Sequence, residues 1–150
     1  MFRGVNNISL DAKGRLAIPV RYRDFLAQHC NGEMVVTIDT DERCLLIYPR
    51  PEWEDLERKV SALSSFNPAS RRVQRLLIGH ATDVELDASG RILIPPPLRQ
   101  YADLDKKTVM LGQVHKLELW SEEHWTTRRD DWLGDQSDQT LPPELENLSL

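Results

Sequence analysis

The most constraining feature of this chain is an internal repeat. The stretch from Asp11 to Pro19 returns in nearly the same form from Asp87 to Pro95, with every key position moved by 76 residues. Both copies fit the frame D-x-x-G-R-[LI]-x-I-P-x-x-x-R, which ends at Arg23 in the first copy and at Arg99 in the second. A repeat of this length predicts two small modules of the same fold.

Each copy has the pattern of two short strands joined by a tight turn. In the first copy, apolar residues stand at every second position on both sides of the turn, as Ile8, Leu10, Leu16 and Ile18. This is the period of strands with one buried face, so we expect a β-hairpin in each copy. The residues expected to structure the turns are a glycine that accepts positive φ and an aspartate that binds free backbone amides, namely Gly14 and Asp11 in the first copy and Gly90 and Asp87 in the second.

The segments around the repeat divide the chain into four parts. We expect the first module in residues 1–66, a linking helix in residues 67–80, the second module in residues 81–134 and an acidic, flexible tail in residues 135–150. Asn67 followed by Pro68 is a helix-start signal, and Gly79 is a stop signal. For the arginines of this linking helix we expect salt bridges to the acidic residues 52–57 in preference to contacts with DNA bases; they are Arg71, Arg72 and Arg75.

Helical periodicity follows the strands of each module. An apolar stripe after Pro51 consists of Trp53, Leu56, Val60 and Leu63, and a corresponding helix capped by Ser121 carries Trp125 and Trp132. Each module alone has too few elements to bury both faces of its sheet, whereas two modules related by a pseudo-twofold axis can exchange strands and hide their edges. We therefore expect a mainly β fold with α-helices (α+β), whose helical stripes contribute to contacts between subunits.

Three motifs together carry a family resemblance: Met-Phe-Arg-Gly at residues 1–4, the doubled D-x-x-G-R-x-x-x-P, and Asn-Pro-x-x-Arg-Arg-x-Gln-Arg at residues 67–75. With them the chain resembles, over about residues 1–134, the MraZ family of bacterial transcriptional regulators, which are built from two SpoVT/AbrB-type domains. The resemblance implies a swapped-hairpin barrel with flanking helices, subunits assembled into a ring, and binding to short direct repeats in double-stranded DNA upstream of the protein's own division and cell-wall operon.

The charge distribution suits DNA binding only at the N-terminal end of the chain. The net charge is −5, but residues 1–31 carry +3 and residues 121–150 carry −6. Phosphate contacts need Lys and Arg, so DNA is expected to meet the N-terminal part. The chain shows no signal-peptide pattern and no membrane span, which predicts a cytoplasmic protein. The DNA binding that the resemblance implies would associate it with the nucleoid. Cys30 and Cys44 lack metal or disulfide spacing, so neither a metal site nor a disulfide is expected. No cofactor or small-molecule substrate is expected either.

Arg15 is the residue predicted to read DNA bases, since a guanidinium on a stiff turn suits the O6 and N7 acceptors of guanine. Lys13 and Arg3 suit phosphate contacts. By the repeat, Arg91 is a possible second contact, but Ser89 replaces Lys13 and the flanking residues are acidic, so we rank it lower.

Other interpretations of the same residues remain open. Arg15 and Arg91 each have an aspartate four residues earlier with which to form an ion pair that only fixes the turn. The acidic C-terminal part is also compatible with an oligomeric scaffold or an antitoxin-like module that binds a protein. An enzyme is not expected, because the sequence contains no phosphate-binding loop, dinucleotide fingerprint or zinc-protease motif.

Overall fold

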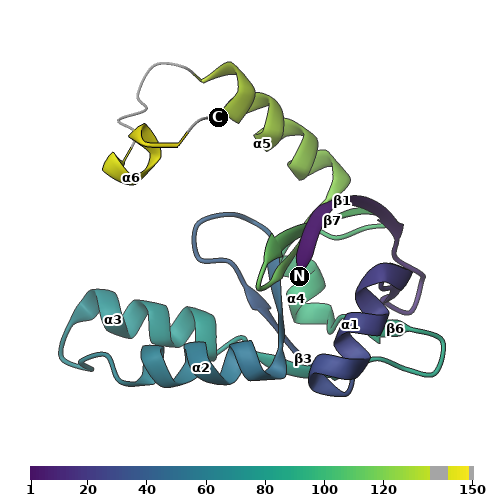
Figure 1. Ribbon diagram of the computed structural model, residues 1–150, viewed down its shortest axis with the longest axis horizontal. Helices are drawn as coiled ribbons and strands as arrows, with labels where there is room; N and C mark the ends of the chain where they lie inside the picture. Colours follow the sequence, from purple (N-terminus) through teal and green to yellow (C-terminus); the bar gives the residue numbers. More distant parts are fainter. Residues whose placement is uncertain (136–141, 149–150) are drawn as a thin grey trace.

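Eight strands and several helices follow one another in the computed structural model, which describes residues 1–135 and 142–148 (Figure 1). The strands are β1 (Phe2–Ser9), β2 (Arg15–Ala17), β3 (Glu33–Ile38), β4 (Leu45–Pro49), β5 (Thr82–Glu85), β6 (Arg91–Leu93), β7 (Lys107–Val114) and β8 (Leu117–Ser121). The helices are α1 (Val20–Cys30), α2 (Arg50–Ser61), α3 (Pro68–Val73), a π-helical turn η1 (Gln74–Ile78), α4 (Pro96–Tyr101), α5 (Glu122–Gly134) and α6 (Pro143–Glu146). The predicted α+β class is confirmed.

The main sheet combines strands from both halves of the chain. Its six antiparallel strands have the order β1-β7-β8-β4-β3-β5, so each edge strand pairs with a strand from the other repeat. At the centre, β4 pairs with β8 and Leu46 lies opposite Glu118. Each is the second residue of its strand, so the two occupy equivalent places in the two halves, and a local twofold axis therefore passes between them.

The β-hairpin expected within each copy does not form as a local pair of strands. Around the first turn the two strands share a single bridge, between Leu10 and Leu16, because β2 pairs instead with β6 of the other repeat. The two-stranded β2–β6 ribbon follows directly from both edge strands of the main sheet, through the turns at residues 11–14 and 87–90. Exchange of strands satisfies the backbone groups that a local hairpin leaves at its outer edge.

The core fills the space between the ribbon, the sheet and the helices α1 and α4. Alternate residues point into it, such as Met34 and Val36 on β3 and Leu16 on β2. The opposite face of β3 and β4 is covered by α2 and η1, where Val35, Trp53, Leu77 and their neighbours form a second cluster. Burial of Trp53 and Val60 within the chain removes them from the surface, so the expectation that this stripe builds subunit contacts is wrong for these two residues. Leu63 lies beyond the helix and is 43% exposed.

The helix after β8 repeats this arrangement on the other half of the sheet. Its predicted cap is confirmed, since the Ser121 hydroxyl accepts a hydrogen bond from the His124 amide at 3.1 Å. Trp120, Trp125 and Trp132 then pack with ring centroids 5.7 to 6.2 Å apart. Packing explains the tryptophans of this region, although Trp132 keeps 44% of its surface exposed.

The linking segment begins as predicted and continues differently. Asn67 caps α3 by accepting from the amides of Ala69 and Ser70, and Gly79 ends the following π-helical turn. The salt bridges expected to residues 52–57 are wrong: the described residues include no ion pair to Arg71, Arg72 or Arg75, all of which are exposed. The acids of α2 pair elsewhere, Glu52 with His29 and Asp55 with Arg58 and Lys59.

Part of the predicted acidic tail lies outside the described residues, namely 136–141 and 149–150. The described remainder includes α6, and the predicted flexibility stays a prediction. No helix within the described residues combines the length and apolar character needed to cross a bilayer. The boundaries proposed for the two modules likewise remain predictions.

Candidate nucleic-acid interface

The first turn is held together by one carboxylate. Asp11 accepts hydrogen bonds on Oδ1 from the amides of Lys13 and Arg15, each at 2.9 Å, and on Oδ2 from Arg15 Nε at 3.0 Å. The amide of Arg15 is the main cause that holds the pKa of Asp11 below its usual value. Because the Asp11 carboxylate accepts all three of these hydrogen bonds, it fixes the backbone conformation of the turn at Arg15.

The second turn has the same construction with a looser ion pair. Asp87 accepts from the amides of Ser89 at 2.8 Å and Arg91 at 2.9 Å, and the Arg91 amide is the main cause that lowers the pKa of this carboxyl. Arg91 Nε stands 3.5 Å from Asp87 Oδ2 and makes no hydrogen bond. The pairing of each arginine with its own aspartate is thus present in both copies, and it is closer in the first.

Ion pairing leaves the ends of the Arg15 guanidinium available. Its side chain is 32% exposed, and among the described residues only Nε has a hydrogen-bond partner. Two parallel donors on one planar group are what a bidentate contact with a base or phosphate requires. The ion pair therefore orients Arg15 without using the atoms that would contact DNA.

The ribbon brings the two arginines together. Arg15 lies opposite Leu93 and Arg91 lies opposite Ala17, so the arginines are diagonal neighbours on one face. Leu16 and Ile92, at the intervening positions, point into the core with 1% exposure each. In agreement with this proximity, Arg15 also contributes to lowering the pKa of Asp87, after the Arg91 and Ser89 hydrogen bonds. The outer face of the ribbon therefore carries one arginine from each repeat.

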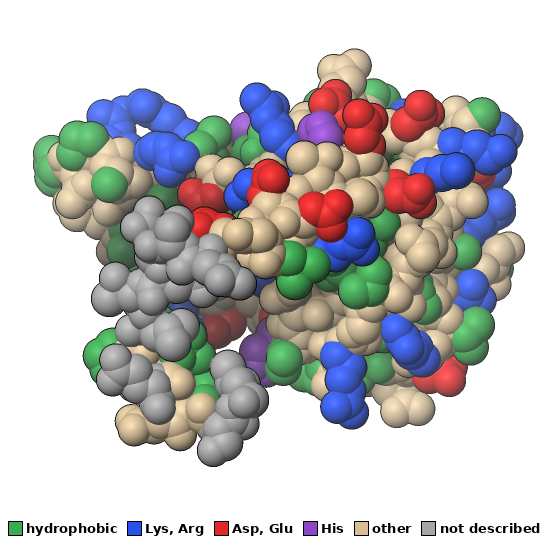
Figure 2. All heavy atoms as spheres, turned by 90° about the horizontal axis from the view of Figure 1, so that it is seen from above, with side chains coloured by type: hydrophobic (Ala, Val, Ile, Leu, Met, Phe, Trp, Pro, Cys, Tyr) green, Lys and Arg blue, Asp and Glu red, His purple; other side chains and the backbone are tan. Residues whose placement is uncertain are grey.

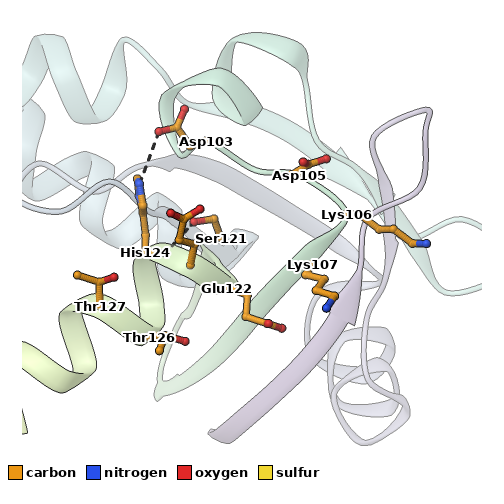
Figure 3. A pocket seen from close by; sticks show the side chains of 10 residues that line it. Asp103, Asp105, Lys106, Lys107, Ser121, Glu122, His124, Thr126 and Thr127 are labelled. Carbon is orange, nitrogen blue, oxygen red and sulfur yellow. Dashed lines mark hydrogen bonds and ion pairs between the residues drawn. The ribbon is translucent and has the colours of Figure 1, made fainter.

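Two lysines from the second half of the chain flank the first turn. Leu10 donates its amide to the carbonyl of Lys106 at 2.8 Å, and Ser9 lies opposite Lys107 in the β1–β7 pair. Both lysines are exposed and have no ion-pair partner among the described residues. Figure 3 shows Lys106 at the base of the purple loop and Lys107 beside β1. Sequence reasoning missed them, because they are almost one hundred residues from Asp11.

The equivalent places beside the second turn carry no positive charge. There Leu86 donates its amide to Gly32, and Glu85 lies opposite Glu33. Figure 2 shows lysine and arginine side chains at the end of the molecule where Figure 1 places β6, with acidic side chains among them, and a further group at the opposite end. The backbone has twofold symmetry, but the charges do not, because two lysines flank the first turn and none stands at the equivalent places beside the second.

Arg3 is not part of this group. It is exposed near the start of β1, seven residues before Leu10, which at about 3.3 Å per residue corresponds to roughly 23 Å along the strand. Its carbonyl accepts a hydrogen bond from Arg21 at the start of α1. The structure therefore unites Lys13 with Arg15 on one turn and separates Arg3 from both.

Comparison with known proteins agrees with this arrangement of two repeats. The sequence model of the family described as "MraZ protein, putative antitoxin-like" matches residues 1–76 and again residues 77–131. The chain belongs to the MraZ family. Relatives named "Transcriptional regulator MraZ" cover the full length of both sequences, with 59% identity in Coxiella burnetii (strain Dugway 5J108-111), 56% in Halorhodospira halophila and 53% in Legionella pneumophila (strain Corby).

The MraZ repeat does not build a metal site in the described residues, which contain no cluster of three or more His, Cys, Asp or Glu side chains suited to an ion. A depression of about 800 Å³ lies beside α5 and is open to solvent. Figure 3 shows its labelled polar side chains spread around the rim, with one ion pair, between His124 and Asp103 at 3.6 Å.

Proposed function

We propose that this MraZ-family protein is a sequence-specific DNA-binding regulator of transcription that acts upstream of its own division and cell-wall operon. It reads short direct repeats through the first Asp-x-x-Gly-Arg turn, with Arg15 on the bases and Lys13 on phosphate. The observation that carries the proposal is the β2–β6 ribbon, which presents Arg15 and Arg91 on one exposed face. The names of the full-length relatives support regulation of transcription.

The two-stranded form of the ribbon suits DNA. The major groove accepts a two-stranded β-ribbon, and a bidentate arginine on guanine O6 and N7 discriminates by roughly 1–3 kcal/mol. Asp11 and Asp87 stay paired with arginines and backbone amides, which lowers the repulsion that free carboxylates would exert on phosphates. Lys106 and Lys107 extend the positive surface beside the first turn, as Lys13 does on the turn itself. We therefore keep Arg15 ahead of Arg91.

One subunit contributes few phosphate contacts, so affinity must come from several subunits. A homo-oligomer, in the proposed form a ring, raises the effective concentration of each turn once the first is bound, and modest contacts combine on directly repeated sites. Arg3 then serves as a flanking phosphate contact at a distance from the turn. Such a regulator acts in the cytoplasm, on the nucleoid.

Catalysis is not part of this proposal. The Cys30 thiol donates to the Leu26 carbonyl at 3.2 Å, and burial raises the pKa of both Cys30 and Cys44. A nucleophilic cysteine needs its pKa lowered. No cofactor or small-molecule substrate is proposed.

The test is a footprint of the full-length protein on DNA from upstream of its own gene, at several salt concentrations. We expect protection of regularly spaced short repeats, with an affinity that falls steeply as salt increases. Uniform protection of unrelated DNA with the same affinity would contradict sequence-specific reading.

A second candidate function is supported by the opposite end of the molecule. Phe66, between α2 and α3, is 95% exposed, and the neighbouring Arg71 and Arg75 have no ion-pair partner among the described residues. An exposed aromatic side chain with arginines is typical of protein-binding surfaces. An oligomeric scaffold or antitoxin-like module would capture a protein in a salt-insensitive way and show no preference for its upstream DNA.

A further inference from the structure

The frame D-x-x-G-R-[LI]-x-I-P-x-x-x-R contains a second half that the proposed DNA contacts leave unexplained. Its last residue is Arg23 in the first copy and Arg99 in the second. Both arginines lie beyond the ribbon, on α1 and α4, and neither forms an ion pair among the described residues. Their position relative to the turns gives them a role.

Arg99 contacts the first turn, which belongs to the other repeat, and not the turn of its own repeat. Gly14 has a φ of +86°, and a Cβ at this position would be 2.6 Å from Arg99 Cζ and 2.8 Å from Arg99 Nε. The guanidinium therefore fills the space that a side chain would take. Gly90, with a φ of +74°, has the same relationship to Arg23, whose Cζ would be 2.6 Å from such a Cβ.

A backbone hydrogen bond accompanies each of these contacts. Ile94 donates its amide to the Gly14 carbonyl at 2.8 Å, and Ile18 donates to the Gly90 carbonyl at 3.0 Å. Pro95 then caps the start of α4, and the Arg99 amide donates to the Pro95 carbonyl at 3.0 Å. One turn of helix thus carries the chain from the Ile94 bond to the Arg99 contact, which accounts for the spacing I-P-x-x-x-R.

We propose that I-P-x-x-x-R is a clamp for the turn of the opposite repeat, and that Arg99 is therefore a positioning residue for Arg15, whereas Arg23 positions Arg91. The inference deepens the proposed function. Only its DNA-binding test rests on that function, whereas its hydrogen-exchange test does not. The two clamps differ in one respect. Arg23 Nε donates to the Ile18 carbonyl, while Arg99 Nε is buried without a hydrogen-bond partner in the described part of the chain.

The first test is amide hydrogen exchange in the full-length protein, resolved by residue and free of DNA. Arg99→Ala is expected to speed exchange about tenfold at Gly14, Arg15 and Ile94, since loosened segments open locally, and to leave Gly90 and Arg91 unchanged. Arg23→Ala, the matched control, is expected to speed exchange at Gly90 and Arg91 and to leave Gly14, Arg15 and Ile94 unchanged. Acceleration of each variant's own turn, or equal acceleration of both turns, would overturn the crossed clamp whether or not the protein binds DNA.

The second test separates positioning from direct contact with phosphate. Arg99→Ala is expected to lower affinity for the upstream repeats about tenfold or more while the salt dependence stays unchanged, because removal of a phosphate contact would reduce the slope by about 0.9. Arg23→Ala is expected to cost less, although it belongs to the same module as Arg15. A fall in the slope, or a larger loss for Arg23→Ala, would contradict the assignment.

A conservative variant completes the test and covers the case in which Arg99→Ala folds poorly. Arg99→Lys keeps the charge and the aliphatic stem but lacks the planar group that lies on Gly14, so we expect intermediate exchange rates at Gly14 and intermediate affinity. Wild-type exchange together with wild-type affinity in this variant would show that the guanidinium does not position the turn.

Discussion

Leu16 lies directly opposite Ile92 in the β2–β6 ribbon, and each side chain is 1% exposed. The two residues occupy the same place in the two repeats, so the local twofold axis passes between them. The inner face of the ribbon belongs equally to both halves of the chain. Neither half can complete this part of the core alone.

Truncation of Leu16 tests this shared core. We expect Leu16→Ala to lower the free energy of unfolding by about 2–5 kcal/mol, the usual range for a buried leucine that leaves a cavity. Unfolding in urea should remain a single transition, since both repeats pack against this side chain. Leu93→Ala removes a 53% exposed side chain from the outer face of the same ribbon and serves as the control, with an expected effect near zero. Two separate transitions would contradict a common core.

Substitution of the two ribbon arginines tests the proposed contact with bases. Arg15→Ala is expected to abolish preference for the upstream repeats in a gel-shift titration, because the variant has no bidentate donors at this position. The melting temperature should change little, since the ion pair with Asp11 is partly exposed and such pairs contribute little to stability.

Arg91→Ala provides the comparison within the same ribbon. It should cost less affinity than Arg15→Ala, because Gly32 and Glu33 replace the two lysines beside its turn. An equal or greater loss for Arg91→Ala would show that the second turn is the main reader.

The lysines beside the first turn are expected to act on phosphate alone. Lys106→Ala combined with Lys107→Ala should weaken binding to all sequences alike and reduce the salt slope by about 1.8, since each neutralised phosphate contributes about 0.9. Arg71→Ala combined with Arg75→Ala removes the same charge from α3 and η1, at the far end in Figure 1, and should leave both quantities unchanged. Loss of sequence preference in the lysine variant would instead indicate contact with bases.

The turn carboxylates predict a loss of stability in acid. Asp11 and Asp87 have pKa values below the ordinary 3.8, so their ionised forms stabilise the folded state. This stability is complete above the unfolded pKa and is lost as the pH falls below 3.8 through the folded values. Asp11→Asn should therefore be less stable than wild type at pH 7, and the difference should be smaller at about pH 2, because protonation of the carboxyl increases as the pH falls through its lowered pKa. Thermal unfolding at both pH values measures this, and a difference that persists unchanged in acid would assign the effect to shape, not charge.

Much of the local structure could be predicted from the sequence. The helix caps at Asn67 and Ser121 depend on residues within one turn of chain, and the structure confirms them. The predicted salt bridges of Arg71, Arg72 and Arg75 failed, because the choice among exposed charged partners differs by little in free energy.

What the sequence determined by itself is the repeat, its turns and the membership of the family, since these depend on the identity and spacing of neighbouring residues. Only the tertiary structure decided which strand pairs with which. A strand after Gly14 makes the same backbone hydrogen bonds with its own copy or with the other, and the apolar period is the same in both cases. Exchange between the repeats placed Arg91 beside Arg15, Lys106 beside the first turn and Arg99 against Gly14, because only the pairing of strands distant in sequence brings these residues together.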